Sequence, residues 1–238
     1  MKIALIGYGK MGKAIEEIAL EKGHEIVLKI DVGNSNEFTK ENLQRADAAI
    51  EFTGPHSAFD NVKKCIEFGV PVISGSTGWL DKWNEISALC ETHNGCLVYS
   101  SNYSIGVNLF FELNKQLAKL MEPYNQYEVS MTEIHHTEKK DAPSGTAISL
   151  AEQILSNMER KNQWVNSPST AVTDLVITSE RIDPAPGTHT VAYSSPIDTI
   201  EITHTAHTRK GFASGAVLAA EFAKNKSGIF TMKEVLGL

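Results

Sequence analysis

The chain has 238 residues and a formal net charge of −7, and 42% of its residues are hydrophobic. This length allows one large or two modest domains with an ample core. The acidic balance argues against a surface for nucleic acid or membranes, and no apolar run approaches the roughly 20 residues that span a bilayer. Within this acidic chain, a local basic cluster comprises His135, His136, Lys139, Lys140 and Arg209. We therefore expect an anionic small molecule as ligand, with neither nucleic acid nor a membrane as partner.

The cysteines are few and scattered. Cys65, Cys90 and Cys96 form no Cys-x-x-Cys motif, which is typical of free or buried thiols in a reducing compartment. The first predicted strand begins directly after Met1, so no targeting peptide is expected. We expect a cytoplasmic protein.

The chain opens with a dinucleotide-binding pattern. An apolar run at 3–6 precedes a glycine turn, a helical segment at 13–19 and a second apolar strand at 26–30 that ends at Asp31. In this fingerprint the first glycine makes the turn, the second admits the pyrophosphate, and the third lets helix and strand pack. The carboxylate about 20 positions later accepts a hydrogen bond from a ribose hydroxyl. The residues predicted to bind the dinucleotide here are Gly7, Tyr8, Gly9, Lys10, Met11, Gly12 and Asp31.

Asp31 also bears on which nucleotide is used. Its carboxylate repels a 2′-phosphate, and the next residue, Val32, offers no compensating cation. We therefore predict that NADH is preferred, with NADPH still possible through Lys10 or a more distant lysine.

Three more apolar runs, at 48–53, 71–74 and 96–99, are typical of buried parallel strands. Ligands of open parallel sheets bind where such strands end, although the same turns also serve as ordinary strand-to-helix connections. From residue 105 the pattern changes to a helix at 107–121, a strand at 127–134, a helix from 145, a polar loop at 157–174, and alternating strands at 175–181, 189–193 and 199–205. A last helix is expected at 213–224. Alternation indicates a sheet with one face covered.

The sequence therefore predicts an α/β protein. A Rossmann-like parallel-sheet dinucleotide domain takes residues 1–104 and 213–238, and an α+β domain at 105–212 is inserted in it. His189, His204 and His207 are interpreted as sheet-face or interface residues of the inserted domain.

The most informative stretch is 133–147, because it combines histidines, lysines and a helix start. Pro143 cannot continue a helix, Ser144 is a good N-cap, and an apolar helical period follows. The first N–H groups of such a helix have no internal partners and bind carboxylate or phosphate. Gly145 lets a ligand approach the backbone, and Thr146 adds a hydroxyl.

Proton transfer and metal binding are the two chemistries that this stretch suggests. A histidine titrates near neutrality and suits general acid catalysis, with Lys139 as a fixed cation or an alternative proton donor. The possible metal ligands are Glu133, His135, His136, Glu138 and Asp141. Their spacing matches no zinc pattern such as His-Glu-x-x-His, and no cysteine is near. We therefore expect no metal here.

The pattern E-x-H-H-x-x-K-x-D-A-P-S-G-T-A at 133–147 resembles the signature of the dihydrodipicolinate reductase family, and every fixed position matches. The resemblance extends along the whole chain, through 7–12, 51–53, 75–78, 101–108 and 202–216. It implies NAD(P)H-dependent reduction of 4-hydroxy-tetrahydrodipicolinate to tetrahydrodipicolinate, with loss of water, on the diaminopimelate route to lysine.

The resemblance also implies roles for individual residues. His135 would donate the proton, with Lys139 as its partner or rival, and the substrate carboxylates would be held by His136, Lys140, Ser144, Gly145 and Thr146. The nicotinamide half of the cofactor would be lined by Thr53, Gly75, Ser76, Thr77, Ser100, Ser101, Asn102 and Tyr103. The inserted domain would bind the substrate and form a homotetramer, and the last helix would pack back on the dinucleotide domain.

Two other functions are compatible with parts of this pattern. One is another two-domain dehydrogenase with a Rossmann N-terminus, of the aspartate or homoserine type, although such an enzyme has no need for His-His-x-x-Lys beside Ser-Gly-Thr. The other is a nucleotide-sensing protein without catalysis, against which the intact His135 and Lys139 argue.

Overall fold

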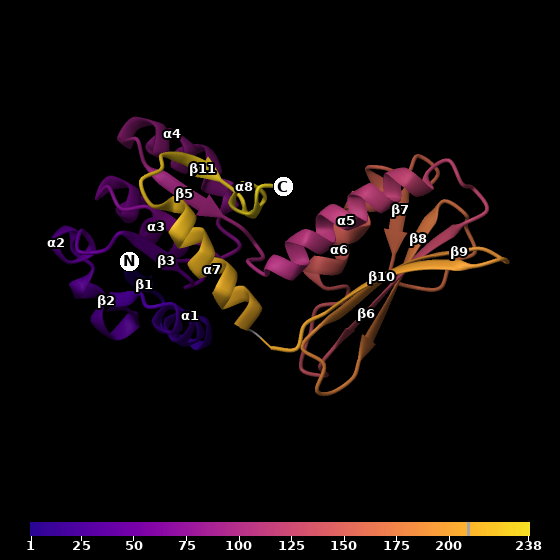
Figure 1. Cartoon of the computed structure of the whole chain (residues 1–238), viewed down its shortest axis with the longest axis horizontal. Helices are drawn as coiled ribbons and strands as arrows, with labels where there is room; N and C mark the ends of the chain where they lie inside the picture. The colour runs from indigo at the N-terminus through magenta and orange to yellow at the C-terminus, as the bar shows by residue number, and fades with distance from the viewer. Residues whose placement is uncertain (209) are drawn as a thin grey trace. The chain divides into compact units, whose positions relative to one another are not determined.

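The structure is a computed structural model that describes residues 1–208 and 210–238. It divides into two compact units, Met1–Asn108 with Lys210–Leu238, and Leu109–Arg209. The chain leaves the first unit within α5 (Ile105–Met121) and returns to it at α7 (Lys210–Ala223) (Figure 1). Across these described residues, no helix combines the length and the apolar character that crossing a membrane requires.

The first unit is built on a parallel sheet. Within its described residues the sheet has six strands in the order β11-β5-β4-β3-β1-β2. Their bounds are β1 (Lys2–Ile6), β2 (Glu25–Ile30), β3 (Ala48–Glu51), β4 (Val72–Ser74), β5 (Cys96–Tyr99) and β11 (Gly228–Phe230). The central strands are apolar along almost their whole length because helices cover both faces of the sheet.

Two apolar clusters lie on the two faces of this sheet. One includes Ile15 of α1 and Val217 of α7, and the other includes Val62 of α3 and Ile86 of α4. The remaining bounds in this unit are α1 (Lys10–Glu21), η1 (Val32–Glu37), α2 (Lys40–Leu43), α3 (Ala58–Glu67), η2 (Leu80–Lys82), α4 (Trp83–His93) and α8 (Met232–Leu236). The helices cover the faces of the sheet, and the carboxyl ends of the strands lead into the loops that follow them.

The second unit contains a mixed sheet. In its described part the strand order is β10-β9-β6-β8-β7, with β6 antiparallel to β9 and parallel to β8. The bounds are β6 (Glu128–His135), α6 (Gly145–Leu155), β7 (Gln163–Val165), β8 (Asp174–Arg181), β9 (Thr188–Ser194) and β10 (Thr199–Thr205). Residues of β6 alternate, so that Val129 and Met131 pack in one apolar cluster with Leu150 and Ile154 of α6.

The predicted fold class is confirmed, but two details predicted from the sequence were wrong, and two short elements after the last helix were missed. The loop expected at 157–174 contains strand β7, whose three residues pair with β8 and are too few to show an alternation. The last helix begins at Lys210 rather than residue 213. After it the chain adds β11 beside β5 and then α8, both too short to give a periodic signal.

Close packing of α7 generates a stability prediction. A Cβ atom at Gly215 would lie 1.7 Å from the Tyr103 carbonyl oxygen, whereas one at Gly211 of the same helix would meet only the Ser104 hydroxyl, at 3.6 Å. We expect Gly215→Ala to lower the free energy of unfolding by about 3 kcal/mol or more, because the helix must move off the backbone. Gly211→Ala should change it by no more than about 1 kcal/mol. Urea unfolding measures both, and equal effects would contradict this packing.

Candidate active site

The predicted cofactor-binding residues follow successive strands of the parallel sheet. Gly7 follows β1, Asp31 follows β2, Thr53 lies just after β3, Gly75 follows β4 and Ser100 follows β5. These five strands are neighbours in the sheet and all run in the same direction. Their carboxyl ends therefore meet at one edge, which is where open α/β sheets bind their ligands.

The glycine turn joins β1 to α1. Gly7 has φ +92°, and a Cβ atom there would lie 2.1 Å from the Phe52 carbonyl oxygen, so only glycine fits. Around Gly9, by contrast, no atom lies within 4 Å of the position a Cβ would take. Helix α1 begins directly after it, at Lys10. Open space at the N-terminus of a helix suits the pyrophosphate of a dinucleotide.

A cavity of about 430 Å³ adjoins this turn. It is lined by Gly7, Tyr8 and Gly9, by Asp31, and by residues that follow β3, including Thr53. The Val32 N–H donates to Asp31 Oδ1 over 2.9 Å, which holds the carboxylate at the start of η1. A carboxylate held beside a cavity of this kind is placed to accept from a ribose hydroxyl.

A buried carboxylate organises the loops after β3 and β4. Glu51, the last residue of β3, has no exposed surface. It accepts from the Thr53 N–H at 2.9 Å, from the Ser74 hydroxyl at 2.7 Å and from the Ser76 hydroxyl at 2.8 Å. The Thr53 hydroxyl is a further donor. Thr53 and Ser76 are thereby held in fixed positions at the edge of the sheet, while Thr77 is exposed beside them.

The loop after β5 is held by its own side chains. The Ser100 hydroxyl donates to the Asn102 carbonyl over 2.7 Å, and the Ser104 N–H donates to the Asn102 side chain over 2.9 Å. Tyr103 differs from the role expected for it, because it is buried and its hydroxyl lies 2.9 and 2.8 Å from the Ser74 and Val98 carbonyl oxygens. Tyr103 therefore supports the loop from within the core, and Ser101 is exposed.

In the second unit, the predicted helix start is present. Ser144 is the N-cap of α6, and its hydroxyl accepts from the Ala147 N–H over 3.2 Å. No atom lies within 4 Å of a Cβ placed on Gly145, which is exposed, and Thr146 is half-buried. The first N–H groups of α6 therefore have room for a carboxylate.

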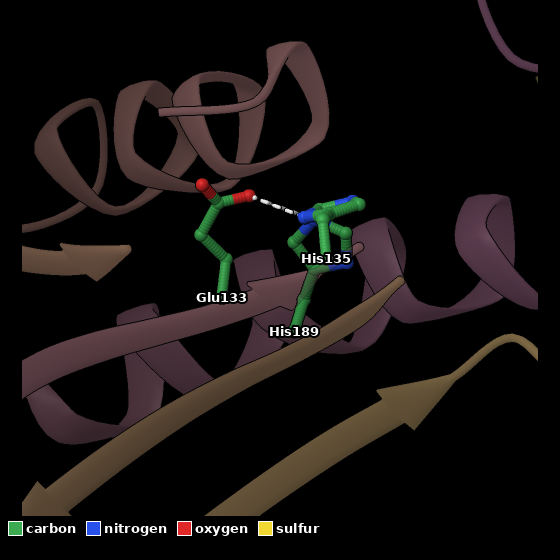
Figure 2. A group of neighbouring side chains, drawn as sticks. All are labelled: Glu133, His135 and His189. Carbon is green, nitrogen blue, oxygen red and sulfur yellow. Dashed lines mark ion pairs between the residues drawn. The ribbon is translucent and has the colours of Figure 1, made fainter. Parts of the chain in front are cut away.

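Next to this helix, three buried polar side chains form a cluster (Figure 2). Glu133 Oε2 lies 2.9 Å from His135 Nδ1 and 3.9 Å from His189 Nε2. The two imidazole rings are 5.1 Å apart and nearly perpendicular. His189 Nε2 also lies 3.0 Å from the Ser144 hydroxyl, so the cluster is connected to the cap of α6.

Strand register explains why these residues meet. Glu133 of β6 is directly opposite His189 of β9, and His135 is directly opposite Arg181 of β8. Arg181 Nη2 lies 3.0 Å from Glu133 Oε1 and 2.6 Å from the Asp141 carbonyl oxygen. The guanidinium therefore joins the end of β6 to the loop that follows it.

Burial sets the charge of the cluster. It lowers the pKa of His135, an effect that Glu133 opposes and the cations Lys139 and Arg181 reinforce. It lowers the pKa of His189 to about 4. Burial alone would raise the pKa of Glu133, but the neighbouring Ser144, Ser179 and Arg181 side chains outweigh it and hold this pKa below its usual value. At neutral pH the cluster thus contains an ionised carboxylate and neutral imidazoles.

The predicted basic residues are placed differently from one another. The Lys139 ammonium lies 2.8 Å from both carboxylate oxygens of Asp141 rather than against His135. His136 is half-buried and Lys140 is exposed. Arg209, which the sequence analysis grouped with them, lies outside the described residues.

The cluster also has the composition of a metal site, since Glu133, His135 and His189 offer ligand atoms within 4.8 Å of one another. A divalent cation there would meet the Arg181 guanidinium on the other oxygen of the same carboxylate. This repulsion favours a hydrogen-bonding and proton-handling role for the three side chains over metal binding.

Comparison with known protein families decides the relationship. The model for the N-terminal part of dihydrodipicolinate reductase matches residues 1–103, and the model for its C-terminal part matches residues 106–236. The chain belongs to the dihydrodipicolinate reductase family. The resemblance that the sequence analysis stated is thereby confirmed.

Individual relatives agree with this assignment. A 4-hydroxy-tetrahydrodipicolinate reductase from Christiangramia forsetii is 48% identical over 99% of this chain and 98% of its own length. Its counterpart from Methanoregula boonei is 37% identical over 82% of this chain and 76% of its own length. Among solved structures, the dipicolinate-bound dihydrodipicolinate reductase of Paenisporosarcina sp. TG-14 has the same fold, with a TM-score of 0.79, 21% identity and 98% of both chains covered.

Two residues of the site were not found from the sequence. Arg181 was treated only as the end of a strand, and His189 was interpreted as a sheet-face residue. His189 does lie on a strand, but it faces the buried cluster of this reductase-family fold rather than solvent. The sequence places both residues near the ends of predicted strands, which is the one feature that could have indicated a role in the site. Their pairing with β6 depends on the strand register, which strand patterns do not reveal.

Proposed function

We propose that this chain catalyses the NAD(P)H-dependent reduction of 4-hydroxy-tetrahydrodipicolinate to tetrahydrodipicolinate, with loss of water, on the diaminopimelate route to lysine. The observation that carries the assignment to residues is the buried pair of Glu133 and His135 beside the capped N-terminus of α6. That arrangement combines a proton donor with a carboxylate-binding helix end. Relatives that carry this activity in their names extend over nearly the whole chain.

The two parts of the chain divide the work. Residues 1–104 with 213–238 would bind the nucleotide at the carboxyl edge of the parallel sheet, and residues 105–212 would bind the substrate. Bound NAD(P)H supplies the hydride for the reduction. The glycine turn, Asp31 and the loops held by Glu51 are suited to position it, because they line one edge and one cavity.

The substrate carries two carboxylates. One would be bound by the N–H groups of Gly145 and Thr146 and the Thr146 hydroxyl, and His136 and Lys140 would attract the other. The Ser144 hydroxyl is already engaged by the Ala147 N–H and His189, so Ser144 would act by holding the helix end in place. The dipicolinate bound by the Paenisporosarcina reductase is a dicarboxylate of this kind.

His135 would donate the proton to the ring carbon. Its pKa is lowered by burial in the free protein, and a bound dianion would raise it again by stabilising the imidazolium. The Lys139 ammonium is held by Asp141, which favours Lys139 as a fixed positive charge near the site over Lys139 as the donor.

The proposal includes an oligomeric state and a cellular compartment. The helices α5 and α6 contribute to a core on one face of the second unit's sheet, and Ser130 and Thr203 of that sheet are exposed. A homotetramer would cover such a face. The three cysteines are buried and free, which suits the reducing cytoplasm.

The activity is tested with a coupled assay. Dihydrodipicolinate synthase, pyruvate and aspartate semialdehyde supply the substrate, and the loss of NADH absorbance is followed. We expect His135→Gln and Lys139→Ala to lower kcat by about 10²–10⁴ because each removes a charge or proton at the reacting ring. The exposed His93→Gln and Lys119→Ala serve as matched controls. Full activity of His135→Gln would remove that residue from the mechanism.

The nucleotide preference is tested with kcat/KM for both cofactors. The cation closest to Asp31 along its strand, Lys29, lies 2.6 Å from Glu16 and stacks 4.8 Å from the centre of the Tyr8 ring, so its charge is already compensated. We expect NADH to be preferred, and Glu16→Gln to improve the use of NADPH relative to NADH by a factor of about two to five, as for an exposed charge pair. Adding Lys29→Ala should abolish that gain. A clearly higher kcat/KM with NADPH than with NADH in the unaltered chain would overturn the predicted preference for NADH.

A further inference from the structure

We infer that Glu133 is a positioning residue for this reduction, one that holds the His135 ring with Nδ1 toward its carboxylate and leaves Nε2 as the atom that gives up the proton. This inference rests on the proposed function, because it concerns how the proposed donor is oriented. Glu133 is a buried carboxylate that neither binds the substrate nor donates the proton in the proposed mechanism.

The geometry of β6 provides the first argument. Glu133 and His135 are two residues apart on one strand, so both side chains leave the same face of the sheet. Only 1% of the Glu133 side chain and 10% of the His135 side chain are exposed, and the two atoms that face each other are 2.9 Å apart (Figure 2). A flip of the ring would replace Nδ1 by a carbon and leave Glu133 Oε2 facing that carbon, which is costly for a buried carboxylate.

The carboxylate is itself held from the other side. Arg181 Nη2 lies 3.0 Å from Glu133 Oε1, and Arg181 Nη1 donates to the Glu180 carbonyl over 2.7 Å. Arg181 therefore donates to one oxygen of Glu133, while His135 Nδ1 lies 2.9 Å from the other as an ion-pair contact. A carboxylate held by Arg181 can impose an orientation on the ring through this contact, which a mobile one cannot.

Two neighbours restrict rotation of the ring. A Cβ atom on Gly187 would lie 2.9 Å from His135 Nε2, so a glycine here leaves this nitrogen free of a neighbouring side chain. The His189 ring lies across the His135 ring at an interplanar angle of 72°. The ring is thus restrained by a charge at Nδ1 and by neighbours that leave little room to turn.

This orientation has a chemical consequence. The proton leaves Nε2 for the electron-rich ring carbon that hydride addition creates, and the electron pair of the N–H bond remains on the imidazole. The neutral ring keeps its hydrogen on Nδ1, facing Glu133, and water then reprotonates Nε2. The charge of Glu133 stabilises the imidazolium and therefore favours recharging of the donor.

The test compares two variants that alter the charge at this ring in opposite directions. The charged or titratable groups around His135 are Glu133 on β6, Lys139 and Asp141 in the loop, Arg181 on β8 and His189 on β9. Glu133 raises the pKa of His135, and Arg181 lowers it. Glu133→Gln should therefore move the loss of kcat/KM at high pH to lower pH, and Arg181→Met should move it to higher pH.

The size of the effect separates positioning from catalysis. We expect Glu133→Gln to lower kcat by about 10²–10³-fold through loss of ring orientation, with KM for NADH unchanged within about twofold. Glu180→Gln is the matched control, because Glu180 is exposed and lies opposite Ile134 of the same strand pair. It should leave kcat and the pH profile unaltered. Thermal melting and NADH binding confirm that each variant is folded.

The outcomes distinguish this inference from the proposed function. If the unaltered chain turns over but folded Glu133→Gln keeps full kcat and the same pH profile, the inference is wrong and the proposed function stands. If Glu133→Gln does not fold, Arg181→Met decides, because its partly exposed side chain is easier to replace. In Arg181→Met, a reduced kcat together with a loss of kcat/KM that moves to higher pH supports the positioning role. A loss of kcat/KM at the same pH as in the unaltered chain overturns it. If the unaltered chain shows no turnover in the coupled assay, the proposed function itself is wrong.

Discussion

A carboxylate remains in a protein interior only when donors or cations surround it, and this constraint shapes both candidate sites. Glu51 is buried at the end of β3 and is satisfied by the backbone and hydroxyls of the loops that face the nucleotide edge. Glu133 is buried near the end of β6, with the Arg181 guanidinium on one oxygen and the His135 ring 2.9 Å from the other. Each carboxylate contacts residues to which we assign a role in binding or catalysis. A neutral replacement at either position would leave those groups without the partner that orients them.

Each of the two candidate sites also contains the N-terminus of a helix. Open space at Gly9 and at Gly145 marks two helix ends whose N–H groups can meet anions, one in each unit. Such ends attract the pyrophosphate of a nucleotide and the carboxylate of a substrate by the same physical means. The proposed substrate site differs from the proposed nucleotide site in having a titratable cluster beside it. A bound dianion would favour the charged form of His135, whereas a pyrophosphate needs no proton donor.

Features that depend on neighbouring residues could be predicted from the sequence. The glycine turn and the Ser144 cap are local arrangements, and both are present where they were expected. Arg181 and His189 could not be predicted, because they reach the cluster only through the pairing of β6 with β8 and β9. Lys139 was predicted as the partner of His135 or its rival as proton donor, and the structure adds that its ammonium lies 2.8 Å from Asp141, two residues further on. The short β7 and β11 were missed because three residues give no period.

The most direct measurement is a crystal structure with pyridine-2,6-dicarboxylate and NADH bound. We expect one carboxylate of the ligand on the N–H groups of Gly145 and Thr146, and its ring facing Nε2 of His135, with Nδ1 still turned toward Glu133. A ligand bound away from residues 135–146, or a His135 ring turned with Nδ1 toward the ligand, would contradict the view that this buried pair directs the chemistry.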